Sequence, residues 1–228
     1  MTVAWLALRE LWISYRLMVI LTGFVTAGAV VALLPADVAT SFGWLAIGCA
    51  GGAGVAAAIS AWSLASERRA GRAAWLVGRG FPRAAIVRGW FAATAIAALL
   101  GLVPSAAFAW VALSPVARSV EPAAYVAAIA AVGCGTLAAI AAGQLAGALL
   151  PRVVAVVAVT LVAGVVAGAS VMAPSTVAVL PPGGHQLLAG LADAARPIGR
   201  ALGAGGLALA ITAALLVLAM AAMERADL

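Results

Sequence analysis

Charged side chains are scarce in this sequence, and one kind is missing. Only 9% of the 228 residues are charged, whereas 66% are hydrophobic. A soluble domain carries roughly a quarter charged residues, so most of this surface must face lipid or other protein. Lysine is absent, and all 13 basic residues are arginine. The chain therefore lacks the lysine that a Walker A nucleotide site places on the phosphates.

Residues that carry catalysis or bind metals are also few. His185 is the single histidine, and its position in a loop predicts a surface or turn residue rather than a ligand. Cys49 and Cys134 lie in apolar, glycine-rich stretches without CxxC spacing, which predicts buried free thiols. No carboxylate lies well inside an apolar stretch, so the paired acids of a proton relay are missing. We expect no catalytic, cofactor-binding or metal site in this chain, and hence no enzyme.

Long apolar stretches dominate what is present. A membrane-spanning helix needs about 20 apolar residues to cross roughly 30 Å of hydrocarbon. Six segments meet this need, at about 17–34, 42–65, 86–113, 123–150, 153–172 and 202–223. The sequence therefore predicts an all-α, polytopic membrane bundle that forms one domain over residues 1–228.

The arginines are divided unevenly between the two ends of this bundle. Six spans put both termini on one side, and that side holds ten arginines, while the other holds only Arg118, Arg196 and Arg200. The positive-inside rule then predicts that both termini are cytoplasmic. Because the arginines lie in short loops between apolar spans, the net charge of +6 indicates membrane topology and not nucleic-acid binding.

Two cytoplasmic segments carry both arginine and tryptophan. Residues 1–16 are predicted to form a short interfacial helix whose tryptophans and arginines share one face, namely Trp5, Arg9, Trp12 and Arg16. Residues 66–89 hold six of the 13 arginines, and we expect a basic helix there that continues the second span and presents Arg68, Arg72 and Trp75 on one face. Each segment fits a plain membrane anchor or loop, and each also fits a docking surface for a cytoplasmic protein.

Two further features lie in and beyond the spans. After a Pro-Gly turn, the segment 173–201 carries an apolar stripe that predicts a short external or re-entrant helix between spans five and six. Gln144 is the strongest polar group within a span, and we expect it to find a partner on a neighbouring helix or across a dimer seam, with a substrate contact as the alternative. Gly143 and Gly147 predict close helix packing beside it.

The order of these segments carries a resemblance. An amphipathic helix, AWLALRELWISYR, precedes the first span, and the second span ends in Glu67-Arg68-Arg69-Ala70-Gly71, an acidic–basic–glycine sequence. A Phe81-Pro82-Arg83 element follows, an external helical element separates the last two spans, and the chain ends in ERADL. In these features the chain resembles the ABC-2 type permeases, the membrane subunits of type V ABC exporters.

The resemblance implies that two permease chains pair around a translocation pathway and that each grips a separate ATPase subunit, which binds ATP and Mg²⁺. It implies that the coupling contacts are Glu67, Arg68, Arg69, Gly71, Arg72, Trp75, Arg79, Pro82 and Arg83. The N-terminal contacts would be Trp5, Arg9, Trp12 and Arg16. An arginine-only basic set with abundant alanine is typical of a GC-rich bacterial genome, so we expect a bacterial cytoplasmic membrane.

Other functions remain open at this point. A permease for haem handling or cytochrome assembly has the same size and topology. A membrane-embedded scaffold or assembly protein without transport is a different class that the same composition allows. A secondary transporter is disfavoured, because no charged residue lies well inside a span.

Overall fold

The computed structural model describes residues 2–34, 37–113, 120–172, 183–191 and 196–225, and for residues 166–172 it describes the backbone only. Within these ranges the chain is helical and has no strand. The helices are α1 (Val3–Ile13), α2 (Arg16–Leu33), α3 (Val38–Arg69), α4 (Arg72–Gly78), α5 (Arg83–Leu113), α6 (Pro122–Leu149), α7 (Arg152–Met172), α9 (Gly183–Ala189) and α10 (Pro197–Arg225).

The long helices coincide with the predicted spans. Among the described residues, α2, α3, α5, α6 and α10 are long and apolar enough to cross a membrane. The fifth predicted span coincides with α7, whose apolar stretch with described side chains, Arg152–Val165, is shorter. The chain is therefore a multi-pass membrane protein with the predicted all-α bundle.

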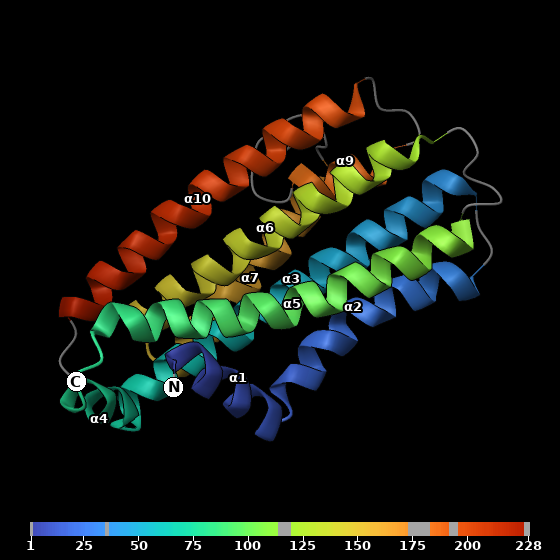
Figure 1. Cartoon of the computed structure of the whole chain (residues 1–228). Helices are drawn as coiled ribbons and strands as arrows, with labels where there is room; N and C mark the ends of the chain where they lie inside the picture. The colour runs from blue at the N-terminus through green and yellow to red at the C-terminus, as the bar shows by residue number, and fades with distance from the viewer. Residues whose placement is uncertain (1, 35–36, 114–119, 173–182, 192–195, 226–228) are drawn as a thin grey trace.

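The spans run side by side as an elongated bundle (Figure 1). α6 packs against α10 on one side and against α3 on the other, while α2 packs against α3 and α5. Close approach depends on small residues. A Cβ added at Gly143 or Gly147 of α6 would collide with the backbone of Ala57 or Ala61 of α3. The predicted packing role of this glycine pair is confirmed.

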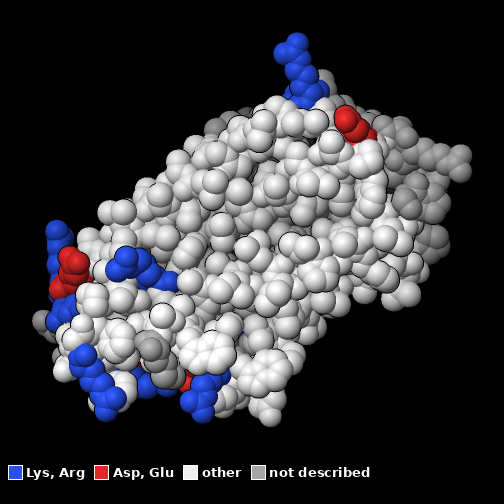
Figure 2. Space-filling view, viewed as in Figure 1, with Lys and Arg blue, Asp and Glu red and all other residues white. Residues whose placement is uncertain are grey.

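Charges gather at one end of the bundle, where the two ends of the chain also lie (Figures 1 and 2). This end carries the exposed arginines Arg9, Arg69, Arg72, Arg79, Arg88, Arg152 and Arg225. The opposite end exposes Arg196 and Arg200, and the surface between the two ends is almost free of charge in Figure 2. This arrangement matches the uneven arginine distribution in the sequence, and we call the first end the arginine-rich end.

Two predicted helices are interrupted. The prediction of one basic helix that continues the second span is wrong. α3 ends at Arg69, and Gly71 adopts a left-handed φ of 69° before α4 begins. Arg68 therefore lies on a different helix from Arg72. At the N-terminus, Tyr15 has a φ of 59°, so α1 ends at Ile13 and Arg16 opens α2 instead of sharing the face of Trp5. A residue with a left-handed φ does not fit a right-handed α-helix, so each of these two helices ends before such a residue.

The predicted external segment is described only in part, since residues 173–182 and 192–195 lie outside the described ranges. Its helix, α9, does not lie flat against lipid but packs between α3 and α6. Leu188 and Leu191 are buried there, and Gly184 sits against the backbone of α6 at Ala131. His185 is likewise buried, so its prediction as a surface residue is wrong. The apolar stripe of α9 faces the bundle, which explains the burial.

Candidate coupling site

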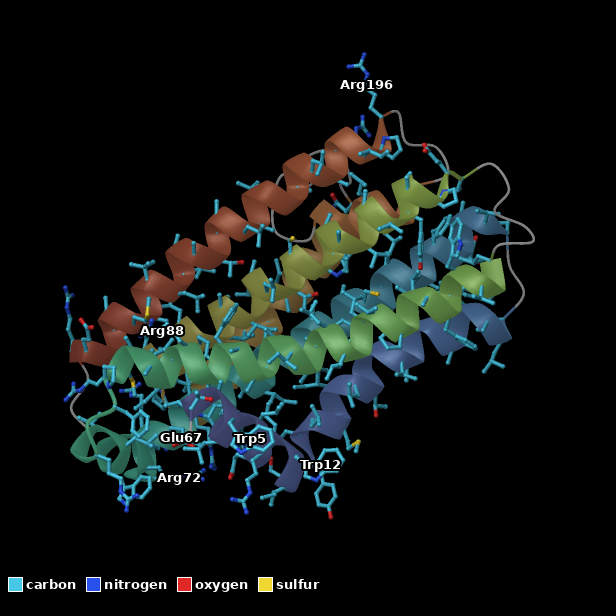
Figure 3. All side chains as sticks on the ribbon, in the orientation of Figure 1. Trp5, Trp12, Glu67, Arg72, Arg88 and Arg196 are labelled. Carbon is cyan, nitrogen blue, oxygen red and sulfur yellow. The ribbon has the colours of Figure 1, made fainter. Side chains whose placement is uncertain are left out.

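The helix α1 has one face in the protein and one face outside it. Val3, Ala7 and Leu11 are buried, and Val3 packs against Gly89 at the start of α5. Trp5 and Trp12 are exposed and project outward (Figure 3). Arg9 is exposed as well. Three of the four predicted N-terminal contact residues therefore share an exposed face, as the helical spacing indicated.

The fourth predicted residue, Arg16, turns inward. Its Nη1 donates a hydrogen bond of 3.1 Å to the hydroxyl of Ser63 on α3. This contact ties the start of α2 to the end of α3, so Arg16 positions two spans and does not belong to the exposed face of α1. A long arginine side chain at a helix end can point toward a neighbouring span or toward the exposed surface. Helical spacing alone therefore did not predict that Arg16 points toward α3.

The short helix α4 is amphipathic. Ala73 and Leu76 are buried, while Trp75 is 54% exposed. The guanidinium of Arg79 lies 4.0 Å from the centre of the Trp75 ring, a cation–π contact that fixes both side chains. The outer face of α4 therefore presents an aromatic ring and a cation held together.

Arg72 joins three separate helices. Its Nη1 lies 3.3 Å from Oε2 of Glu10 on α1, and its Nη2 lies 3.1 Å from Oε1 of Glu67 on α3. The hydrogen bond with Glu10 raises the pKa of Arg72 above its ordinary value, so the cation is reinforced. Figure 3 labels Glu67 and Arg72, which lie at the arginine-rich end of the bundle. Glu67 therefore pairs with an arginine that lies beyond the turn at Gly71.

The carboxylate of the Arg72–Glu67 pair is buried, while the side chain of Arg72 is half-exposed. Only 5% of Glu67 is exposed, whereas surface ion pairs contribute little because water screens both charges. A buried carboxylate without its cation is strongly destabilising. Arg72 therefore holds α1, α4 and the end of α3 as one unit, which we call the elbow unit.

The other predicted coupling arginines lie in different surroundings. Nη1 of Arg68 donates to the carbonyl oxygens of Gly147 and Ala148 at the end of α6. Nη1 of Arg83 donates at 2.7 Å to the carbonyl oxygen of Glu224 at the end of α10. Both residues therefore stabilise helix C-termini, where cations are favoured. Arg69 is exposed, beside the turn at Gly71.

Pro82 is also exposed and directly precedes α5.

Gln144 lies at the α3–α6 contact and is fully buried. Its Nε2 donates a 2.6 Å hydrogen bond to the hydroxyl of Ser60 on α3, and that hydroxyl donates to the carbonyl oxygen of Ile140. The expectation of a partner on a neighbouring helix is confirmed. Gln144 therefore joins the two helices that Gly143 and Gly147 bring together.

Two residues of the site were missed from the sequence, Glu10 and Ser63. Glu10 is one of only seven acidic residues and lies in an arginine-rich region, which is a usable signal for an ion pair. Ser63 carried no such signal, because a serine in a span usually bonds to its own helix. Its contact with Arg16 depends on how α2 and α3 pack.

The arginine-rich end combines exposed aromatic and basic side chains. Among the described residues, no group of three or more histidine, cysteine or acidic side chains could hold a metal ion. The exposed indole rings there lie next to guanidinium groups, as Trp75 does to Arg79. Such groups are enriched at protein–protein contacts.

Comparisons with known proteins return no match. No protein-family model matches the chain, and neither a curated protein nor a solved structure does. The fold and the arginine-rich end define the class as a multi-pass α-helical membrane protein.

Proposed function

We propose that this chain is the membrane-spanning permease subunit of an ATP-binding-cassette transporter, an exporter of the ABC-2 type. Two copies, or one copy and a similar chain, pair around the pathway in a bacterial cytoplasmic membrane. Both termini lie in the cytoplasm, following the positive-inside rule. Separate subunits bind ATP and Mg²⁺ and supply the energy.

The observation that carries the proposal is the elbow unit. Arg72 ties α1 and α4 to the buried Glu67 at the end of α3, so these parts move together. On their outer faces the unit exposes Trp5, Trp12 and the stacked pair of Trp75 and Arg79. A simple loop does not need an arginine that bridges carboxylates on two other helices. This construction suits a surface that receives a push from another protein.

The mechanism that follows is mechanical. Closure of the ATPase subunits on ATP presses on the elbow unit, and the push passes directly into α3. Arg83 links the start of α5 to the end of α10, so the same displacement reaches two more spans. Packed helices shift as rigid bodies and not by continuous deformation, so the pathway between two chains changes shape.

The proposal is tested by purification. The tagged chain is isolated in mild detergent from membranes of its native host, and the product is assayed for vanadate-sensitive ATP hydrolysis and for a Walker-type subunit by mass spectrometry. We expect both with the wild type. The double variant Trp75→Ala/Arg79→Glu should lose most of the hydrolysis and most of the subunit.

The matched control is Arg200→Glu, which reverses an exposed arginine at the opposite end and should retain the ATPase. Equal recovery and equal melting temperature of the three chains would show that the variants fold. Wild-type protein that carries no ATPase, or a double variant that keeps it, would overturn the proposal and favour a scaffold without transport.

A further inference from the structure

A cavity of about 470 Å³ lies between α3, α6 and α7. Its walls are mostly small apolar side chains, for example Ala53 of α3, Ala142 of α6 and Ala158 of α7, and His185 of α9 is the polar residue in its lining. Such a lining offers water almost no hydrogen bonds, and a water molecule needs two to four polar partners to be held. An apolar group therefore fits this cavity better than water does.

The shape of the cavity is elongated. Its lining runs along α6 from Gly135 to Leu149, which are 14 residues apart and therefore about 21 Å apart at 1.5 Å per residue. Leu149 and Val162 are both exposed, so the cavity reaches the side of the bundle, where lipid lies. A long, narrow space that opens toward lipid matches an acyl chain rather than a compact solute.

A second hollow, of about 240 Å³, adjoins the arginine-rich end of this cavity, since Leu149 lines both. Its polar lining comes from Arg68 and Arg69. Among the described residues, no carboxylate lies within 4.0 Å of either guanidinium. Nε of Arg68 is buried without a hydrogen-bond partner there. That nitrogen is itself buried, so what the hollow offers a ligand is positive charge, from the exposed Arg69 and the partly buried Arg68.

A third arginine lies close to the same face of α3. Trp62, Ser66 and Arg69 are spaced at i, i+4 and i+7 on α3. The guanidinium of Arg152, at the start of α7, lies 4.1 Å from the Trp62 ring, and the hydroxyl of Ser66 is buried without a partner among the described residues. Three arginines thus surround the α6–α7 corner.

We propose that this place binds one anionic phospholipid, with an acyl chain in the cavity and the phosphate against Arg69 and Arg68. Guanidinium groups match phosphate geometry, and basic pockets between membrane helices on the cytoplasmic side bind anionic headgroups. The adjoining apolar cavity favours a lipid over a soluble phosphate. The inference goes beyond the transporter proposal and does not depend on an ATPase partner.

The test is native mass spectrometry of the purified full-length chain in neutral detergent. The chain is titrated with phosphatidylglycerol and with phosphatidylcholine of the same acyl chains. We expect one phosphatidylglycerol per chain to be retained in preference to phosphatidylcholine. Arg69→Gln and Arg152→Gln should each weaken that binding about fivefold, the effect of one basic residue near an anionic headgroup. Arg88→Gln, an exposed arginine of α5 at the same end, should leave binding unchanged.

The cavity is tested separately with Ala142→Phe, which fills it, and with Val126→Phe, a control on the exposed face of α6. Ala158→Leu fills the cavity from α7 and replaces Ala142→Phe if that variant does not fold. We expect the filling variant to lose bound phosphatidylglycerol and the control to keep it.

Three results would overturn the inference. The first is equal retention of phosphatidylglycerol and phosphatidylcholine by the wild type. The second is unchanged phosphatidylglycerol binding in the arginine variants, and the third is unchanged binding in the variant whose cavity is filled. Displacement of the lipid by millimolar glycerol phosphate would likewise overturn it in favour of a soluble anion. None of these readouts needs an ATPase, so failure here and failure of the transporter proposal are distinguishable.

Discussion

At the scale of single residues, the contact between α3 and α6 depends on the absence of a side chain. Gly143 and Gly147 of α6 face the backbone of α3, which brings Gln144 within 2.6 Å of Ser60. Lipid offers no hydrophobic driving force between helices, so van der Waals contact and such hydrogen bonds hold them together. One added methyl group at this place separates the helices and removes both contributions.

We therefore expect Gly143→Ala to destabilise the protein by about 1–3 kcal/mol, the usual cost of overpacking a close contact. The added Cβ collides with the carbonyl group of Ala57, which is backbone and cannot turn away. The check is the melting temperature in detergent. Gly51→Ala is the matched control on α3, because its added Cβ meets no atom within 4 Å. Equal melting of Gly143→Ala and wild type would contradict the packing argument.

At the scale of elements, the arginines act chiefly at helix ends. Arg68 closes the end of α6, Arg83 closes the end of α10, and Arg72 ties α4 to α1. A helix end leaves unpaired carbonyl groups that a guanidinium satisfies while its charge opposes the helix dipole. Several residues predicted as contacts for a partner thus also shape this chain.

For the elbow unit we expect Arg72→Glu to release α1. The substitution removes the cation from the buried Glu67 and places a third carboxylate beside Glu10. Amide hydrogen exchange in α1 should become faster, while exchange in the middle of α6 stays the same. The double variant Glu10→Arg/Arg72→Glu should slow the exchange again in part, because it restores one of the two pairs. Unchanged exchange in α1 after Arg72→Glu would show that apolar packing alone holds this helix.

At the scale of the whole molecule, charge is separated along the bundle. The arginine-rich end gathers α1, α4 and the ends of several spans, and the surface between the two ends is almost uncharged (Figure 2). Charged groups are costly inside a bilayer, so the uncharged belt locates the hydrocarbon and the arginines locate one face.

This arrangement predicts a labelling pattern. In a background with Cys49→Ala and Cys134→Ala, we expect Arg79→Cys to react with a membrane-impermeant maleimide only from the cytoplasmic side. Glu121→Cys, at the opposite end, should react only from the outside. Intact cells and inverted vesicles supply the two sides. A reversed pattern would contradict the orientation on which the transporter proposal depends.

The spans could be predicted from the sequence because their signal is local. Apolar stretches such as 17–34 and 202–223 are long enough to cross a bilayer whatever surrounds them, and prolines at 35 and 151 mark ends that any packing must respect. The amphipathic spacing of Trp5, Arg9 and Trp12 also held, because it belongs to one helix. Residues 70–71 gave a weaker signal, since a glycine does not by itself specify a left-handed turn.

By itself, the sequence determined the class of protein, its uneven charge and the helices that cross the membrane, since composition and hydrophobic length decide these. Only the tertiary structure decided where each arginine points, that His185 is buried, and that α3, α6 and α7 enclose a cavity. The physical reason is that these features depend on which helices become neighbours. Which helices pack together is decided by contacts between segments far apart in the chain, such as Gly143 with Ala57. A local sequence pattern does not specify such contacts.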